Sequence, residues 1–265
     1  MTQRLVNPIG AARREAGRYF AAQQFLTRVP CPPSTPFDPD DLAASIGWFP
    51  TVGVLVGSVV GGVAVALRNV VTPSFAAVVA VAVGAAVTGA FHEDGFADTC
   101  DAFGGYTVAR RREIMRDSRI GTFGAVGLIA LFAAKVSVLS SLLSFASGTK
   151  IVFASICAHT VSRCATVVAI RFIPPVNDPT SKTQSYRVSD PRLFFALAFP
   201  TVPIAVWLIG WNATFLGGTV VVLIESARPF FRRFSDGISG DGLGAINQLS
   251  EVVAWAVVLH TLSGG

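Results

Sequence analysis

Charged side chains are scarce in this sequence. Asp, Glu, Lys and Arg make up 14% of the 265 residues, whereas 52% are hydrophobic. Soluble domains are typically about 25% charged, because polar surface has to cover their core. A chain so poor in charge, with a mean hydropathy of +0.58, is expected to use lipid as part of its solvent. The net charge of +5 then indicates orientation in a membrane and not a nucleic-acid partner, since the basic residues fall between apolar runs.

Paired cysteines, linkers and a signal peptide are also missing. The four cysteines form no Cys-x-x-Cys pair, which argues against a zinc site or a disulfide framework. No Pro/Ser-rich or highly charged linker divides the chain, so we predict one polytopic membrane domain over residues 1–265. Residues 1–45 carry five arginines and no suitable apolar core. We therefore expect a cytoplasmic or interfacial segment there, and targeting by the internal spans.

Apolar runs are abundant, and several approach the 20 or so residues that a membrane span needs. They cover residues 46–67, 74–91, 121–145, 151–173, 193–209, 213–227 and a shorter 252–262. Backbone polar groups cannot stay unpaired in lipid, and these runs are too long for barrel strands. We therefore predict an all-α integral membrane protein with six or seven transmembrane helices.

The distribution of basic residues predicts the orientation of these spans. All but four of the 21 Lys and Arg residues lie before the first run or in, or at the edges of, the loops that follow runs two, four and six. The exceptions are Arg68, Lys150, Lys135 and Arg163. Because cytoplasmic loops are rich in Lys and Arg, we expect a multi-pass protein of the cell inner membrane whose N-terminus and long loops face the cytoplasm.

The N-terminal stretch 11–29 combines Arg13, Arg14 and Arg18 with aromatic residues. This pattern is typical of an amphipathic helix that lies on the membrane surface. An ordinary helix packed on the bundle is an equal alternative.

Three aspartates crowd the end of the second run, in the segment FHEDGFADTCDAFGG at 91–105. If the helix continues, Asp94, Asp98 and Asp101 share one face, because they are spaced i, i+4, i+7. Such carboxylates repel each other unless a cation lies among them, and an all-oxygen donor set suits Mg²⁺. The motif indicates a metal site for phosphoryl or diphosphate chemistry, with Glu93 as a further candidate ligand. The alternative is a solvated acidic helix end.

A second polar motif, Asp117-Ser118-Arg119, stands just before the third run and a series of glycines. An acid and a base beside a glycine-rich helix start could bind metal and phosphate. We therefore expect Asp117 and Arg119 in the catalytic site and Ser118 at the substrate. Positive-inside anchoring is the simpler interpretation for Arg110, Arg111 and Arg112.

A third motif, SDGISGDGLGAINQLSE at 235–251, is predicted to be a loop. Its glycines would leave backbone N–H groups free to approach phosphate. Ser239 and Gly240 are therefore candidate substrate-binding residues, and Asp241 could join the metal cluster. A flexible connector is the alternative.

Two basic residues lie within apolar runs, where a charge is costly and needs a partner. For Arg163 the expected partner is a substrate phosphate or one of the aspartates. For Lys135 a structural ion pair is an equal alternative.

Five segments together resemble a known enzyme family. They are FLTRVPCP (25–32), GWFPTVGVLVG (47–57), FHEDGFADTCDAFGG (91–105), MRDSRIGTFGAVGL (115–128) and GISGDGLGA (237–245). In this order they are similar to the cobalamin synthases, or adenosylcobinamide-GDP ribazoletransferases. The resemblance implies an enzyme that joins adenosylcobinamide-GDP to α-ribazole or its 5′-phosphate, releases GMP, and requires Mg²⁺.

The resemblance also implies roles for individual residues. The three aspartates of the acidic motif would hold Mg²⁺, with help from Asp117 or Asp241. The position of Asp101, last along the helix and nearest water, makes it the expected general base. Arg119 and Arg163 would hold phosphate oxygens. The chain departs from the family pattern at Ala102, usually Gly, at Ser239, usually Thr, and at Gln248, often Glu, which argues against a metal role for Gln248.

Two other functions would use the same charged residues. A phosphotransferase of the CDP-alcohol or isoprenoid type would use the same metal chemistry on a hydrophobic acceptor. A transporter would use the acids and the intramembrane cations as an ion path, but it predicts acids near mid-membrane and inverted repeats, and neither is evident. The expected partners are small-molecule substrates and membrane lipid, without nucleic acid; a homo-oligomer is left open.

Overall fold

The computed structural model describes residues 8–32, 43–177, 183, 186 and 188–264 of the chain. These residues are helical apart from loops and one isolated β-bridge between Pro175 and Ile238. Among them, six helical segments are long and apolar enough to cross a membrane, and a seventh does so if two helices bent by 93° form one span. The predicted all-α integral membrane fold with six or seven transmembrane helices is therefore confirmed.

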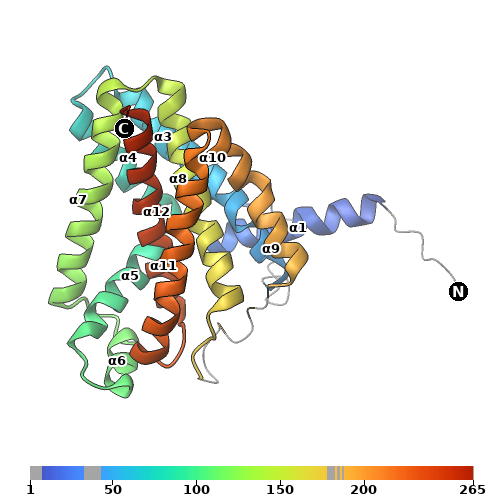
Figure 1. Ribbon diagram of the computed structural model, residues 1–265, viewed down its shortest axis with the longest axis vertical. Coiled ribbons are helices and arrows are strands. Elements are labelled where there is room, and N and C mark those ends of the chain that lie inside the picture. The colour runs from blue at the N-terminus through green and yellow to red at the C-terminus, as the bar shows by residue number, and fades with distance from the viewer. Residues whose placement is uncertain (1–7, 33–42, 178–182, 184–185, 187, 265) are drawn as a thin grey trace, which may run out of the picture.

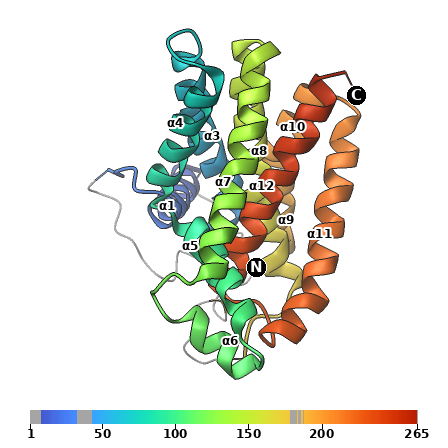
Figure 2. The same cartoon turned by 90° about the vertical axis from the view of Figure 1, so that its left-hand side faces the viewer.

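The long helices stand side by side as a bundle (Figures 1 and 2). The spans are Ala43–Leu67 with η1 (Ile46–Trp48) and α3 (Phe49–Leu67), α7 (Thr122–Phe145), α8 (Gly148–Phe172), Asp190–Ile209, α11 (Asn212–Phe234) and α12 (Gly240–Leu262). The span Asp190–Ile209 consists of α9 (Asp190–Ala196), η4 (Leu197–Thr201) and α10 (Val202–Ile209). A short helix, α6 (Val108–Met115), lies at one end of the bundle (Figure 2).

Helix α8 is the centre of the bundle and packs most closely against α3. Three glycines on α3, Gly53, Gly57 and Gly61, recur every four residues and face α8. A Cβ atom on them would lie 2.4 Å from the His159 carbonyl oxygen, 2.5 Å from the Ile156 Cα and 2.7 Å from the Val152 Cα, respectively. Small residues at this spacing let helix backbones approach closely in lipid, which explains the glycine repeat in this span.

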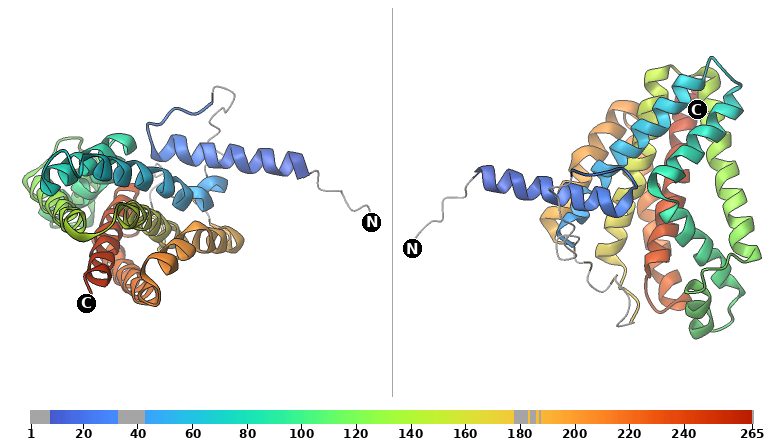
Figure 3. Two further views of the ribbon diagram at one scale, coloured as in Figure 1. Left: turned by 90° about the horizontal axis from the view of Figure 1, so that it is seen from above. Right: turned by 180° about the vertical axis from the view of Figure 1, so that it is seen from behind.

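Helix α1 (Pro8–Leu26) lies across the side of the bundle and projects away from it (Figures 1 and 3). Its C-terminal part is packed, with Ala21, Ala22 and Leu26 buried, whereas Arg13 and Arg14 are exposed. Glu15 fastens it to the bundle: its carboxylate accepts hydrogen bonds from Arg192 at 2.8 and 2.9 Å and from the Trp48 indole at 3.0 Å. The helix thus combines the two alternatives considered from sequence, a packed end and a projecting basic end.

The second span is not one continuous helix, contrary to the sequence prediction. Helix α4 (Pro73–Thr88) ends at Gly89 and Ala90, which both adopt left-handed backbone conformations (φ 65° and 55°), and α5 (Phe91–Asp101) then leaves at 93°. The N-terminal segment braces this break. The Arg28 N–H donates to the Val87 carbonyl at 2.7 Å, and a Cβ on Gly89 would lie 2.4 Å from the Arg28 Nε.

The glycine-rich segment 235–251 is also not the loop that the sequence indicated, because α12 begins at Gly240. Ser239 caps this helix, its hydroxyl accepting a hydrogen bond from the Gly242 N–H at 3.1 Å. The glycines serve a helix crossing: a Cβ on Gly244 would lie 3.1 Å from the His92 carbonyl oxygen, and one on Gly95 would lie 2.9 Å from the Asp241 Cα. Close packing against α5 therefore outweighs the low helix propensity of glycine.

Candidate active site

The acidic motif forms one side of α5, as its spacing predicted, although that helix is separated from α4 by the bend. The α5–α12 crossing places Asp241 beside this acidic face. Asp98 is repelled electrostatically by Asp241, Asp94 and Asp101, and Asp241 is repelled by Asp94. The structure therefore gathers the three motif aspartates and Asp241, which come from segments some 140 residues apart, into one cluster of like charges. We call these four residues the aspartate cluster.

Asp101 has a structural task within the aspartate cluster. Its two carboxylate oxygens accept hydrogen bonds from the Gly121 and Gly124 N–H groups, both at 2.7 Å, at the start of α7. A Cβ on Gly124 would lie 2.3 Å from an Asp101 oxygen, so only glycine fits there. Free N–H groups at a helix N-terminus stabilise an anion. Both Asp101 oxygens are therefore engaged in fixing the start of α7, and its predicted role as general base stays a prediction.

Asp117 and Arg119 form a forked ion pair beside Asp101. The Arg119 Nε and Nη2 donate to the two Asp117 oxygens at 3.0 and 2.7 Å. Arg119 holds the pKa of the Asp117 carboxyl at about 2, well below its usual value, because its guanidinium hydrogen-bonds to the ionised form. The pair therefore stays fully charged at neutral pH.

A cleft of about 690 Å³ opens beside this pair. Its lining is basic and acidic with an apolar side, formed by Asp101, Arg110, Glu113, Ile114, Arg116, Asp117, Arg119, Ile120, Gly121, Thr122 and Phe123. The cleft is large enough for a substrate with charged and planar parts, and it touches the aspartate cluster through Asp101. Ser118, which stands between the ion-pair partners, is exposed.

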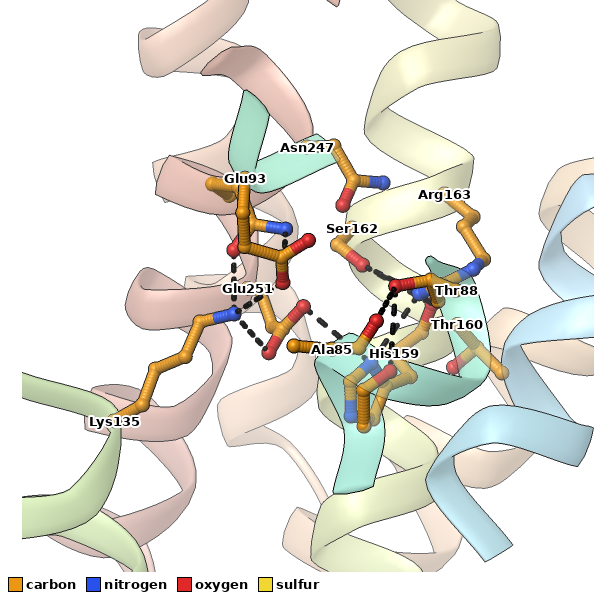
Figure 4. Close-up of polar contacts among 12 residues, drawn as sticks. Ala85, Thr88, Glu93, Lys135, His159, Thr160, Ser162, Arg163, Asn247 and Glu251 are labelled. Atoms are coloured by element: carbon orange, nitrogen blue, oxygen red, sulfur yellow. Dashed lines mark hydrogen bonds and ion pairs between the residues drawn. The ribbon is translucent and has the colours of Figure 1, made fainter. Parts of the chain in front are cut away.

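Glu93 and Arg163 lie elsewhere, in a buried group of charges between α5, α7, α8 and α12 (Figure 4). Lys135 forms an ion pair with Glu251 at 2.7 Å and lies 3.9 Å from Glu93. Arg163 is only 2% exposed and donates to the His159 carbonyl at 3.0 Å. Arg163 thus finds its partners inside the bundle; among the described residues it forms no hydrogen bond or ion pair with the aspartate cluster and does not line the cleft.

The sequence interpretation missed Glu251 because the last apolar run was taken to begin just after it. Glu251 is 3% exposed, and its second oxygen lies 3.4 Å from the His159 Nδ1. Lys135 and Arg163 could have pointed to Glu251, since each intramembrane cation requires an anion at a similar depth. The structural ion pair considered for Lys135 is confirmed.

The aspartate cluster has the donor chemistry for Mg²⁺, but its geometry falls short of a complete cage. Among the described residues, no three His, Cys, Asp or Glu side chains converge closely enough to hold a metal ion. Mg²⁺ usually binds through one or two carboxylates, with waters and substrate phosphates as its other ligands. Two aspartates of the cluster would satisfy that requirement.

Together these features define a class: a multi-pass helical membrane protein that presents a carboxylate cluster and an arginine-lined cleft at one end of its bundle. Within that class the chain belongs to the cobalamin-5-phosphate synthase family, whose model matches residues 18–259. No solved structure matches the chain.

Three similar curated proteins share the name adenosylcobinamide-GDP ribazoletransferase. The protein of Leptothrix cholodnii is 36% identical over 256 residues, covering 93% of this chain and 96% of the relative. That of Shewanella frigidimarina is 34% identical over 249 residues, with 93% and 95% covered. That of Albidiferax ferrireducens is 37% identical over 265 residues, with 88% and 94% covered.

Proposed function

We propose that this protein is an adenosylcobinamide-GDP ribazoletransferase. It joins adenosylcobinamide-GDP to α-ribazole, or to its 5′-phosphate, releases GMP, and forms adenosylcobalamin or its 5′-phosphate. The observation that carries the proposal is the match to the family over residues 18–259, to which the aspartate cluster and its cleft add a site of suitable chemistry. The same relatives give no support to a CDP-alcohol or isoprenoid phosphotransferase or to a transporter.

The proposed reaction breaks the phosphoanhydride bond of adenosylcobinamide-GDP and forms a phosphodiester. The 3′-hydroxyl oxygen of ribazole forms a bond to the phosphorus attached to cobinamide, the bond from that phosphorus to GMP breaks, and the hydroxyl proton passes to a carboxylate. We assign that proton acceptor to Asp98, because Asp101 is engaged by two backbone N–H groups. Arg119 stands at the cleft wall, where it is suited to hold phosphate oxygens.

Mg²⁺, bound by two or more of Asp94, Asp98 and Asp241, would supply neutralisation of the diphosphate charge. Asp94 is exposed and Asp98 is half-buried, so both are accessible from the end of the bundle. Their mutual repulsion in the absence of a counter-charge supports this assignment.

We further propose that the site faces the cytoplasm from the inner membrane. The segment 107–120, which carries Arg110, Arg111, Arg112, Arg116 and Arg119, directly follows the acidic helix and shares its end of the bundle (Figure 2). The excess of positive charge at this end supports a cytoplasmic orientation. Adenosylcobinamide-GDP and α-ribazole would then reach the cleft from water.

The test is GMP release by the purified protein in liposomes, with adenosylcobinamide-GDP and α-ribazole, with and without Mg²⁺. We expect release that depends on Mg²⁺, and a decrease on the order of a hundredfold or more in Asp98→Asn. Asp190→Asn is the matched control, since Asp190 is exposed and pairs with Arg171, away from the cluster. Absence of GMP release from the wild-type protein, or full activity of Asp98→Asn, would refute the proposal.

A further inference from the structure

Four charged side chains are buried where the acidic helix meets the rest of the bundle. Glu93 and Glu251 carry the negative charges and Lys135 and Arg163 the positive ones, and each is 7% exposed or less. Figure 4 shows them converging from different helices, with Glu93 on one side of Lys135 and Glu251 on the other. Two acids and two bases leave these four side chains without a net charge. We call these four residues the buried charge group.

Glu93 is the member of the buried charge group that belongs to the acidic helix. It directly precedes Asp94, but its carboxylate turns inward and accepts a hydrogen bond from the Gln248 amide of α12 at 3.2 Å. The same oxygen lies 3.9 Å from the Lys135 ammonium of α7. Lys135 is itself fixed by Glu251 of α12 at 2.7 Å and by a hydrogen bond to Gln248. Glu93 therefore ties α5 to two neighbouring helices at once.

Directional bonds to neighbouring helices hold α5 at its last residue, Asp101, and at Glu93 near its start. At its start the chain enters through Gly89, which has a left-handed conformation available to few other residues, and at its end Asp101 holds α7. At the crossing with α12 the contact is glycine against backbone, which permits close approach but supplies no directional bond. An ion pair and a hydrogen bond from Glu93 provide that direction. The angle of the Glu93 side chain about the axis of α5 then determines where the next residue, Asp94, points.

We propose that Glu93 is a positioning residue for the acidic face of α5, acting through Lys135 and Gln248, and that it is not a metal ligand. Its task is to hold Asp94 and Asp98 in the rotation that faces Asp241 and the cleft. Buried ion groups are weak sources of stability but can select one arrangement over others. The proposal deepens the proposed function, on which its activity readout rests.

A native probe of α5 is available in Cys100. This thiol is half-buried against α7, where a Cβ on Gly127 would lie 2.7 Å from its sulfur. Release of α5 exposes the sulfur, so the rate of maleimide labelling at Cys100, located by mass spectrometry of the protein in nanodiscs, reports the position of the helix. Cys157 and Cys164 are buried within α8 and serve as internal references.

The decisive comparison is between Glu93→Ala and Asn247→Ala. Asn247 is fully buried on α12 and donates a hydrogen bond to Thr166 of α8, so this control removes a buried polar group that does not join α5 to its neighbours. Glu93→Ala is expected to raise Cys100 labelling about tenfold by easing local opening, to lower kcat on the order of a hundredfold through misplacement, and to raise the Mg²⁺ concentration for half-maximal activity. Asn247→Ala should change none of the three.

Two further variants keep the test decisive. Glu93→Gln retains the shape and the acceptor oxygen, so it should restore most of the wild-type labelling rate. Lys135→Met removes the cation and leaves the sequence of α5 unchanged, so it should reproduce the labelling of Glu93→Ala. Wild-type labelling in Lys135→Met or Glu93→Ala, or equal labelling in Asn247→Ala, would overturn the proposal. A wild-type protein that releases no GMP would refute the enzyme function alone, because the labelling comparison requires no turnover.

Discussion

The aspartate cluster and the buried charge group solve opposite electrostatic problems within a few residues of each other. The aspartate cluster gathers four acids at the end of the bundle with no base among them, whereas the buried charge group balances two acids with two bases inside it. Like charges that the fold does not neutralise require a counter-charge from outside, such as a cation or a basic substrate group. Within the buried charge group opposite charges compensate each other, although the Glu93 Oε2 and the Arg163 Nε have no hydrogen-bond partner among the described residues. Glu93 and Asp94 are adjacent in the sequence, but Glu93 belongs to the buried charge group and Asp94 to the aspartate cluster.

The largest effect is expected where the balance of the buried charge group is broken. Lys135→Met leaves two buried carboxylates facing each other without their common cation, and removal of one partner of a buried pair costs about 3–5 kcal/mol. Thermal unfolding in detergent measures the loss. Lys150→Met, which changes an exposed lysine, should leave the unfolding temperature unchanged. Equal effects of the two substitutions would remove the distinction between buried and exposed charge here.

A smaller effect is expected at the crossing of α5 and α12, which brings Asp241 beside the acidic helix. Gly95→Ala introduces a methyl group 2.9 Å from the Asp241 Cα, which forces α5 and α12 apart at a cost of about 1–3 kcal/mol. GMP release should fall more than it does in Gly62→Ala, since a Cβ on Gly62 meets no atom within 4 Å. Wild-type turnover in Gly95→Ala would mean that the close crossing is not needed to assemble the aspartate cluster.

Asp98→Asn should separate stability from activity. Removing one charge from four mutually repelling aspartates relieves repulsion, so the free energy of unfolding should stay constant or rise by roughly 0.5 kcal/mol while turnover is lost. A clear loss of stability in the absence of divalent cations would show that the aspartates are held by interactions within the protein, as the buried charge group is.

The smallest effect is expected at the partly exposed ion pair between Glu15 of α1 and Arg192. Arg192 lowers the pKa of Glu15 from 4.5 to about 2, because its guanidinium hydrogen-bonds to the ionised carboxylate. The folded-state pKa is below the unfolded one, so the stabilisation is complete above pH 4.5 and is lost as the pH falls toward 2. Glu15 is 37% exposed, so solvent screening limits the loss in Glu15→Gln to roughly 0.5 kcal/mol at neutral pH. The unfolding temperatures of the wild-type protein and of Glu15→Gln, measured as a function of pH, check this.

The spans and the acidic face could be predicted because they depend on local properties. Apolar runs have to be helical in lipid, and the i, i+4, i+7 spacing of Asp94, Asp98 and Asp101 places them on one face of any helix. The structure moved the ends of most spans by only a few residues.

The bend and the last helix depend on contacts between distant segments, which the sequence does not display. Gly89 takes its left-handed conformation beside Arg28, about 60 residues earlier in the chain. The glycines of 240–244 have the composition of a loop, but Gly244 packs against α5 and Gly242 against Phe231 of α11, contacts that the sequence does not display. Glu251 was missed because a charge ended the apolar run, although Lys135 required an anion at its depth.

The contact between Arg28 and the bend has a consequence for the order of assembly. Ribosomes release a chain from its N-terminus, so Arg28 and the helix before it are present while α4 and α5 are still being made. The segment that contacts the bend is therefore synthesised before the bend itself. Arg28 is therefore in place to support the bend between α4 and α5 as soon as both helices have been made.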